Sequence, residues 1–220
     1  MKLKKSLKLI DIFSIATGAM ISSGIFILPG LAHAKAGPAM VVAYLLAGLL
    51  AMTGMLSQAE LVTAMPKAGG TYFYVTRSLG PAIGTIDGLI TWLSISLKSA
   101  FALFGMAAFL IPFTTIDIHF ISISLAVFFI FINYLSVGHA GKIQRGLVFF
   151  LIMLLLIYII KGLPHINVLN FENFAPGGFP SILSTAGFVF IAYGGLLKIA
   201  SVAEETTEPA KIPSGMIASL

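Results

Sequence analysis

Long apolar runs, separated by short polar links, dominate the pattern of hydrophobic and polar positions along this chain. A helix needs about 20 apolar residues to cross the hydrocarbon core of a bilayer. Runs of that order recur along the whole sequence, so we predict an all-α integral membrane protein with about six transmembrane helices. The expected spans are Leu9–Ala34, Ala39–Thr63, Ile83–Ile111, Phe120–Val137, Leu147–Ile160 and Pro180–Ala203.

The links between these spans differ in character. Pro66–Arg77 contains an aromatic cluster and is expected to form an interfacial helix. Gly138–Gly146 is expected to be a basic link, and Lys161–Phe179 a longer loop with prolines and a glycine pair.

The composition indicates that lipid is the solvent for this chain. Of its 220 residues, 58% are hydrophobic and 10% are charged, and the mean hydropathy is +1.03. Soluble domains carry about 25% charged residues, so a water-soluble core could not bury this much apolar surface. The absence of cysteine excludes disulfides and thiolate metal sites. We find no metal-ligand spacing, catalytic triad or phosphate-binding loop, and we expect neither an enzyme nor a cofactor.

The basic residues lie beside the ends of the apolar runs, which is typical of membrane topology rather than of nucleic-acid binding. The N-terminal Met1–Lys8 resembles the head of a signal peptide, but the following apolar run is too long for one. With the N-terminus inside, nine Lys and Arg residues flank inner ends and two flank outer ends, so both termini are expected in the cytoplasm. We expect a multi-pass protein of the plasma or inner membrane. The inner residues are Lys2, Lys4, Lys5, Lys8, Lys67, Arg77, Lys142, Arg145 and Lys211, and the outer ones are Lys35 and Lys161.

The first span contains a group of residues that weaken a helix. Gly18–Pro29 holds glycines, two adjacent serines and a proline at mid-depth. Freed backbone groups are tolerated in a membrane only where they are buried in protein or line a wet cavity. We predict a break near Ser22–Gly24, where a half-helix end could hold an anionic group such as a carboxylate. The alternative is that these small residues only let a neighbouring helix approach closely.

The sixth span is interrupted in a similar way, at Tyr193-Gly194-Gly195. Because the first and sixth spans are five spans apart, they enter the membrane in opposite directions. Corresponding breaks in two halves indicate a carrier built from inverted repeats, with a substrate site between the breaks.

Several segments, spaced between Asp11 and Pro213, match the motifs of one transporter family in order and spacing. They are Gly18–Phe26, Gly37-Pro38, Ala59-Glu60-Leu61, Pro66–Val75, Gly80-Pro81, Trp92-Leu93-Ser94, Phe190–Gly195 and Ala203–Pro213. With them the chain resembles the amino acid–polyamine–organocation (APC) superfamily, the amino acid permeases.

The resemblance implies a site for amino-acid-like solutes between the two breaks. The substrate carboxylate would lie on amides of the first break, and the ammonium on freed carbonyls near Ile21 and in the sixth span. Phe190 or Tyr193 could cap the site as an aromatic gate, and the alternative for both is helix packing or an interface anchor. The implied substrate-binding residues are Ile21, Ser22, Ser23, Gly24, Ile25, Phe190, Ala192, Tyr193 and Gly194.

Three positions depart from the family pattern. Ser22 stands where the family usually has glycine, so its hydroxyl could narrow the pocket or donate to the substrate. Leu151 falls where some relatives place a lysine that replaces a sodium ion, which puts coupling by that lysine in doubt. Leu197 occupies a position that is often acidic, and Lys198 follows it.

Lys98 and Lys198 lie within predicted spans. A cation at the bilayer centre costs about 2.5–3.5 kcal/mol on insertion scales. Lys198 is a candidate for tuning specificity or coupling, but it lies six residues before Glu204, so extension to the cytoplasmic face is the favoured alternative. Lys98, near the middle of its span, is the stronger candidate for tuning specificity or coupling, by lining the vestibule, binding an acidic substrate or exchanging a proton.

The expected function is secondary active transport of amino acids or related amines by alternating access, by proton symport or exchange. The partners would be the substrate, protons and the lipid bilayer, and the sequence sets no oligomeric state. We expect one membrane domain over residues 1–220, with a first five-helix repeat at about 9–162 and the first helix of a second repeat at about 180–203. The C-terminal half of the family fold is missing, so a partial or truncated chain is expected. The alternative is a non-transporting membrane sensor or assembly subunit that retains the fold, and a channel fits less well because no filter is visible.

Overall fold

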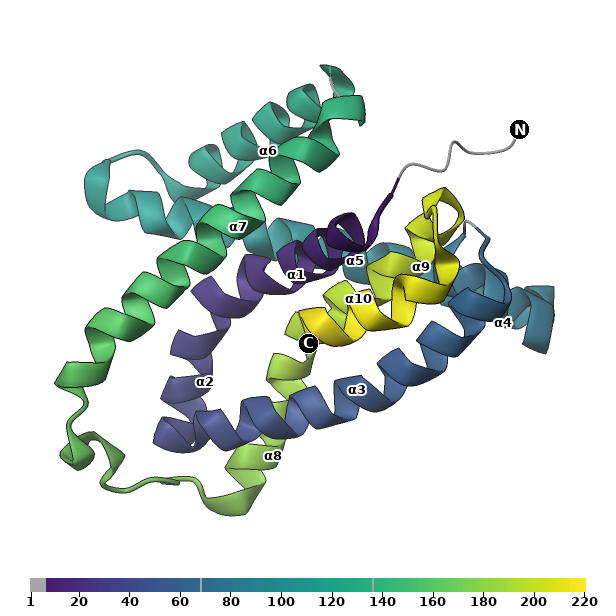
Figure 1. Ribbon diagram of the computed structural model, residues 1–220. Helices are drawn as coiled ribbons and strands as arrows, with labels where there is room; N and C mark the ends of the chain where they lie inside the picture. Colours follow the sequence, from purple (N-terminus) through teal and green to yellow (C-terminus); the bar gives the residue numbers. More distant parts are fainter. Residues whose placement is uncertain (1–6, 68, 136) are drawn as a thin grey trace. The chain divides into compact units, whose positions relative to one another are not determined.

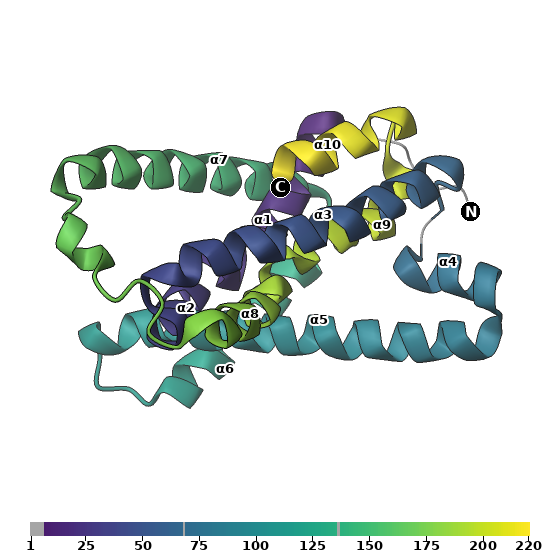
Figure 2. The ribbon, with the colours of Figure 1, turned by 90° about the horizontal axis from the view of Figure 1, so that it is seen from below.

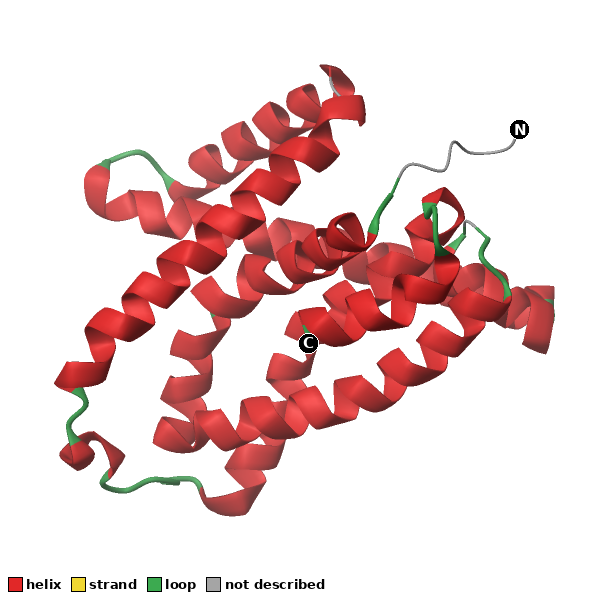
Figure 3. Cartoon of the chain, viewed as in Figure 1, coloured by secondary structure: helices red, strands yellow, loops and turns green. Residues whose placement is uncertain are grey.

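The computed structural model describes residues 7–67, 69–135 and 137–220, which are helical over most of their length (Figure 3). Within that part of the chain the structure contains no strand beyond an isolated parallel bridge between Leu7 and Thr206. The predicted basic flank of residues 1–6 and Ala68 lie outside the described residues. The side chains outside the description are those of Ser22, Ser23, Asn133, Leu135, residues 137–143, Val168, Leu197 and Pro209.

The chain divides into two compact units, the first made of residues up to Gly70 and from Gln144 onward, and the second of Thr71–Ile143. Helix α7 (Val137–Gly162) runs through the boundary at Gln144. The other main helices of the first unit are α1 (Leu9–Phe26), α2 (Leu28–Ala36), α3 (Met40–Ala64), α8 (Gly178–Val189), the 3₁₀ helix η5 (Phe190–Lys198), α9 (Ile199–Val202) and α10 (Ile212–Ser219). The second unit holds α5 (Pro81–Leu110) and α6 (Ile118–Leu135), with nearly all of α4 (Gly70–Leu79).

Helix α3 organises the packing of the first unit. Buried residues recur every fourth position, as expected for one side of an α-helix, at Ala43, Ala47, Ala51, Met55 and Ala59, and Gln58 and Val62 are buried as well. Small side chains on this face let α2 and α8 approach closely. The resulting core joins all three helices and consists of Ala32, Ala43, Ala47, Ala186 and Val189. Figures 1 and 2 both show α3 passing beside α2 and α8.

The opposite face of α3 carries large exposed apolar residues. Leu45 is 65% exposed and Leu49 is 59% exposed. A soluble protein rarely leaves such contiguous apolar surface uncovered. The exposed face therefore suits lipid or another apolar surface.

The expected six apolar segments are all helical in the structure. Among the described residues, four helical stretches are long and apolar enough to cross a membrane by length and composition, and two shorter apolar helices cover the remaining positions. The four are Leu28–Ala64, Pro81–Phe113, Gln144–His165 and Gly178–Glu205, and the shorter two are Leu9–Ile21 and Ile118–Ile132.

A sharp turn at Gly37 divides the longest of these stretches. Gly37 has φ +60°, a conformation that favours glycine, and a Cβ there would lie 2.9 Å from Pro176 Cδ. Figure 1 shows the chain changing direction between α2 and α3. Helix α2 therefore continues the first expected span, and α3 forms the second.

The structure corrects the predicted link between the fourth and fifth spans. We expected a basic link at Gly138–Gly146, but α6 ends at Leu135 and α7 begins at Val137. The link contains no proline to stop a helix, and its Lys and Arg residues have good helix propensity. The basic segment therefore forms the first turns of α7.

In the second unit, α4 forms where a helix was predicted between the second and third spans. It begins at Gly70, and it is fastened to α5 by a hydrogen bond that Thr71 Oγ1 donates to Asp87 Oδ2 (2.9 Å). Helices α5 and α6 pack against each other, and the rings of Phe104 and His119 lie 6.0 Å apart.

Candidate functional site

The first apolar segment is interrupted at Ile27, where α1 ends and α2 begins. Pro29 explains this position, because it has no N–H to donate to the Ile25 carbonyl four residues earlier and its ring crowds that carbonyl. Pro29 stands in the first turn of α2, where a missing N–H costs nothing. The predicted break near Ser22–Gly24 is therefore wrong in position, since the small residues remain within α1 and the proline sets the break.

The sixth segment changes its helical form rather than breaking completely. Regular α-helix stops at Val189, and the nine residues of η5 form a 3₁₀ helix. Runs of 3₁₀ helix longer than three or four residues are uncommon and often mark a functional hinge. The predicted interruption at Tyr193–Gly195 is thus present, and it begins earlier, at Phe190.

The two interrupted segments lie side by side within the first unit. A Cβ on Gly24 would lie 2.9 Å from the Cβ of Ala192, and a Cβ on Gly195 would lie 2.6 Å from the backbone nitrogen of Met20. Each close approach is possible only because glycine carries a hydrogen where other residues carry a Cβ. Close helix packing, the alternative that the sequence left open for these small residues, therefore operates at Gly24.

Two tyrosine hydroxyls connect these segments to α3. Tyr44 Oη donates a hydrogen bond to the Gly24 carbonyl oxygen (3.1 Å). Tyr193 Oη donates to the Tyr44 carbonyl oxygen, also at 3.1 Å. Gly48, one turn after Tyr44, leaves the space for this contact, because a Cβ there would lie 3.2 Å from Tyr193 Oη.

The predicted site residues fall into two groups by burial. Ile21, Gly24 and Ala192 are buried. Ile25 is 38% exposed and Phe190 is 45% exposed. Gly194 is exposed and Tyr193 is half-buried, while the side chains of Ser22 and Ser23 lie outside the described set. The junction thus combines a tightly packed glycine contact with an exposed apolar rim.

The two lysines within predicted spans lie in different units. Lys198 ends η5 in the first unit, and its side chain is exposed. Lys98 is half-buried in α5 of the second unit.

Tyr44 and Gly48 were not among the residues predicted from the sequence. The available signal was a tyrosine in the first part of an apolar run, with a glycine four residues later. Buried tyrosine hydroxyls usually find a hydrogen-bond partner, so such a residue indicates a polar group on a facing segment.

An apolar groove of about 410 Å³ lies along α3, on the side that carries the contact between Tyr44 and Tyr193. Its lining includes Tyr44, Gly48, Tyr193 and Leu220. No cluster of three His, Asp or Glu residues suited to a metal ion occurs in the part of the chain that the structure describes.

A family model described as amino acid permease matches residues 11–220. The chain belongs to the amino acid permease family. This membership and the apolar helices identify the chain as part of an integral membrane protein of the APC superfamily.

Curated relatives align over nearly the whole chain. A branched-chain amino acid permease, BcaP, of Bacillus subtilis (strain 168) is 28% identical over 99% of this chain and 52% of the relative. The protein of the same name from Lactococcus lactis subsp. cremoris (strain MG1363) is 32% identical over 96% of this chain and 51% of its own length. Cationic amino acid transporter 5 of Arabidopsis thaliana is 29% identical over 100% of this chain and 42% of its own length. The chain thus spans about half the length of the curated relatives it matches.

Proposed function

We propose that this permease is a secondary active transporter of an amino acid or a related amine, working by alternating access with proton symport or exchange. One observation carries the proposal: the two interrupted apolar segments, α1–α2 and α8–η5, pack against each other at Gly24 and Ala192. Paired interruptions of this kind build substrate sites in secondary transporters. Family membership supports an amino acid as the transported solute.

The proposed site comprises the residues singled out from the sequence. Amides of the last turn of α1, from Ser22 to Ile25, bind the substrate carboxylate, and carbonyls at Ile21 and in η5 around Phe190, Ala192 and Tyr193 bind the ammonium, with Gly194 at the rim. In the structure those amides lie within α1, so binding the carboxylate requires this turn to unwind. Glycine and serine are poor helix formers, which makes unwinding there inexpensive.

A neutral, apolar amino acid is the preferred substrate. None of the nine proposed site residues carries a charge, and a cationic side chain would be costly to bury without an anionic partner. The relatives named for branched-chain amino acids agree with this preference, and the one named for cationic amino acids supplies the competing possibility. The charges of Lys98 and Lys198 in the sequence also leave an acidic substrate open, and glutamate uptake tests that possibility.

We place the protein in the plasma or inner cell membrane with its N-terminus in the cytoplasm, on the distribution of Lys and Arg. Because the chain has no cysteine, single engineered cysteines probed with an impermeant thiol reagent test this topology. A cysteine at Thr207 should react only from the cytoplasmic side, and reaction from outside would reverse the orientation.

The deciding experiment is uptake of labelled leucine, lysine and glutamate into proteoliposomes, with and without a pH gradient. It is run on this chain and on the longest open reading frame that contains it. Leucine uptake that a pH gradient stimulates supports proton symport, and uptake that needs internal substrate supports exchange. Folded protein that takes up none of the three, in either form, overturns the transporter proposal in favour of a sensor or assembly subunit.

A further inference from the structure

Two adjacent backbone carbonyls at the end of α1, those of Gly24 and Ile25, differ in the hydrogen-bond donors available to them. The Ile25 carbonyl has no helical donor, because the residue four positions later is Pro29. The Gly24 carbonyl accepts the hydroxyl of Tyr44 at 3.1 Å. The break therefore presents one carbonyl that a side chain occupies beside one that its own helix leaves open.

The hydroxyl of Tyr44 comes from a well-supported helix. Helix α3 has 25 residues, and the Tyr44 side chain packs against the cluster of small buried residues that joins α2, α3 and α8. The Tyr44 backbone is engaged as well, since its carbonyl accepts the Tyr193 hydroxyl at 3.1 Å. A residue larger than glycine at position 48 would crowd that second contact.

These contacts form a chain of bonds across three segments, from Tyr193 in η5 through Tyr44 in α3 to Gly24 in α1. Both interrupted segments are thus hydrogen-bonded to the same helix, α3. A substrate ammonium that needs a carbonyl at the break competes with the Tyr44 hydroxyl at Gly24 and meets no helical competitor at Ile25.

We infer that Tyr44 is a positioning residue of the substrate site, whose hydroxyl holds the Gly24 carbonyl and so leaves the Ile25 carbonyl open to the substrate ammonium, in addition to the carbonyls proposed at Ile21 and in η5. This inference rests on the proposed transport function and deepens it. Tyr44 does not touch the substrate in this arrangement, and it acts through the backbone of α1.

The first test uses Tyr44→Phe, which removes the hydroxyl and keeps the ring. Competition against leucine uptake is measured with leucine itself and with leucic acid, the hydroxy acid that carries a hydroxyl in place of the ammonium. Loss of one hydrogen bond that orders the site should weaken leucine about 3- to 10-fold and leave leucic acid within about 2-fold. The matched control is Tyr158→Phe, because Tyr158 is 76% exposed, and both ligands should bind it as they bind the unaltered protein. Equal weakening of both ligands, or no change in either, overturns the inference.

A second test does not depend on transport. The chain has no cysteine, so Ile25→Cys creates a single thiol at the break. Combining it with Tyr44→Phe should raise the rate of reaction with a small hydrophilic maleimide about 3-fold or more, because the last turn of α1 loses its anchor. Combining it with Tyr158→Phe should leave the rate unchanged.

The two tests separate the two proposals. An accelerated thiol reaction in a protein that takes up no amino acid overturns the transporter proposal and retains Tyr44 as the anchor of the break. Leucine uptake with unaltered ligand discrimination and an unaltered thiol rate overturns the role of Tyr44 and leaves the transporter proposal standing.

Discussion

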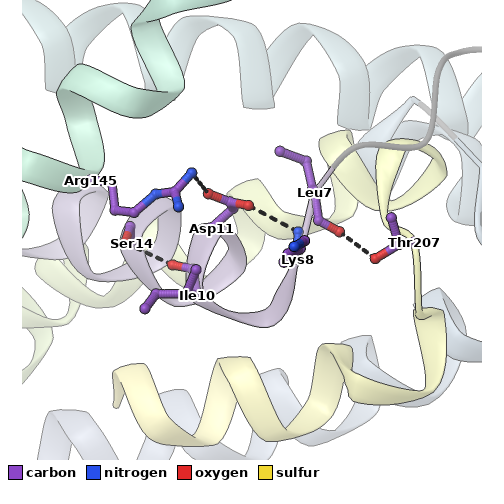
Figure 4. Close-up of polar contacts among 7 residues, drawn as sticks. All are labelled: Leu7, Lys8, Ile10, Asp11, Ser14, Arg145 and Thr207. Atoms are coloured by element: carbon purple, nitrogen blue, oxygen red, sulfur yellow. Dashed lines mark hydrogen bonds and ion pairs between the residues drawn. The ribbon is translucent and has the colours of Figure 1, made fainter.

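Helix α1 is fastened at its two ends by different chemistry. At its N-terminal end Asp11 accepts the Lys8 amide (3.0 Å) and pairs with Arg145 of α7 (2.5 Å), as Figure 4 shows. The preceding residue, Leu7, donates its N–H to the Glu205 carbonyl (3.0 Å) and accepts the Thr207 N–H (2.9 Å). At its other end, the described contacts of α1 are uncharged: the Tyr44 hydroxyl on Gly24 and the close packing of Gly24 against Ala192.

This difference follows from the dielectric surroundings expected along a spanning helix. An ion pair repays its desolvation where water or headgroups are near, and costs more in the hydrocarbon interior. Neutral hydroxyl–carbonyl bonds and glycine contacts carry no such penalty. The N-terminal end, with the contacts of Leu7 and Asp11, is therefore an anchor of α1. The break, with the contacts of Gly24, is a joint that can exchange its hydrogen bonds without separating charges.

The largest expected effect lies at the joint. Gly195→Ala places a Cβ 2.6 Å from the Met20 nitrogen and 2.8 Å from the Ala19 carbonyl carbon. Both are backbone atoms, so neither can swing away, and the segments must separate. We expect a loss of about 3 kcal/mol in the free energy of unfolding, the upper end of the range for overpacking, measured by chemical denaturation in detergent micelles.

The matched control for this change is Gly187→Ala. Gly187 lies in α8, and a Cβ there meets nothing within 4 Å. Alanine should leave stability unchanged or raise it by about 0.5–1 kcal/mol, because it has better helix propensity than glycine. Similar losses at the two positions would show that glycine is not required for close packing at the joint.

The second effect lies at the anchor. Arg145→Gln leaves Asp11 buried without its ionic partner, with 11% of its side chain exposed. We expect a loss of about 1–2 kcal/mol, because the Arg145 side chain is 37% exposed and water screens the pair. The measurement is a double-mutant cycle with Asp11→Asn, in which the two single losses should not add.

The chain supplies an internal reference for this ion pair. Lys211 pairs with Glu208 at 2.7 Å, but these side chains are 55% and 60% exposed. Lys211→Gln should change stability by less than about 0.5 kcal/mol. If Arg145→Gln were equally neutral, the anchor would reside in the backbone bonds of Leu7 instead.

The two ends also differ in how far the sequence could predict them. Hydrophobic periodicity, segment length and composition were sufficient to predict the helices, because an apolar run of about 20 residues has few alternatives to a helix in lipid. The existence of a break in the first segment followed from Gly18–Pro29, but its position did not, because glycine and serine only weaken a helix whereas Pro29 removes a donor. The contact of Gly24 with Tyr44 joins positions twenty residues apart on different helices, and no local pattern fixes which faces meet. The pairing of Asp11 with Arg145 could not be predicted for the same reason, although Arg145 stood out as a charge beside an apolar run.

A smaller effect tests whether the joint depends on its second hydroxyl. Tyr193→Phe removes the donor to the Tyr44 carbonyl and keeps the ring that packs against the core. The carbonyl lies within α3, where the helix supplies its own N–H, so it is not left without a partner. We expect a loss of about 0.5–1.5 kcal/mol, measured as for Gly195→Ala. A loss as large as that of Gly195→Ala would indicate that the hydroxyl, rather than the packing, holds η5 in place.

The smallest effect is expected at Thr207, whose hydroxyl and N–H both donate to the Leu7 carbonyl at 2.9 Å. Thr207→Val removes the hydroxyl bond and leaves the backbone bond, and valine keeps the branched shape at Cβ. The side chain is exposed, so water can replace the lost hydroxyl as a donor to the Leu7 carbonyl in the variant. The free energy of unfolding should therefore change by less than about 0.5 kcal/mol. Exchange of the Thr207 amide hydrogen reports the backbone bond directly and should remain as slow in the variant as in the unaltered protein. Faster exchange would mean that the hydroxyl holds the N-terminal segment on the turn after α9, and that the anchor of α1 is weaker than its ion pair indicates.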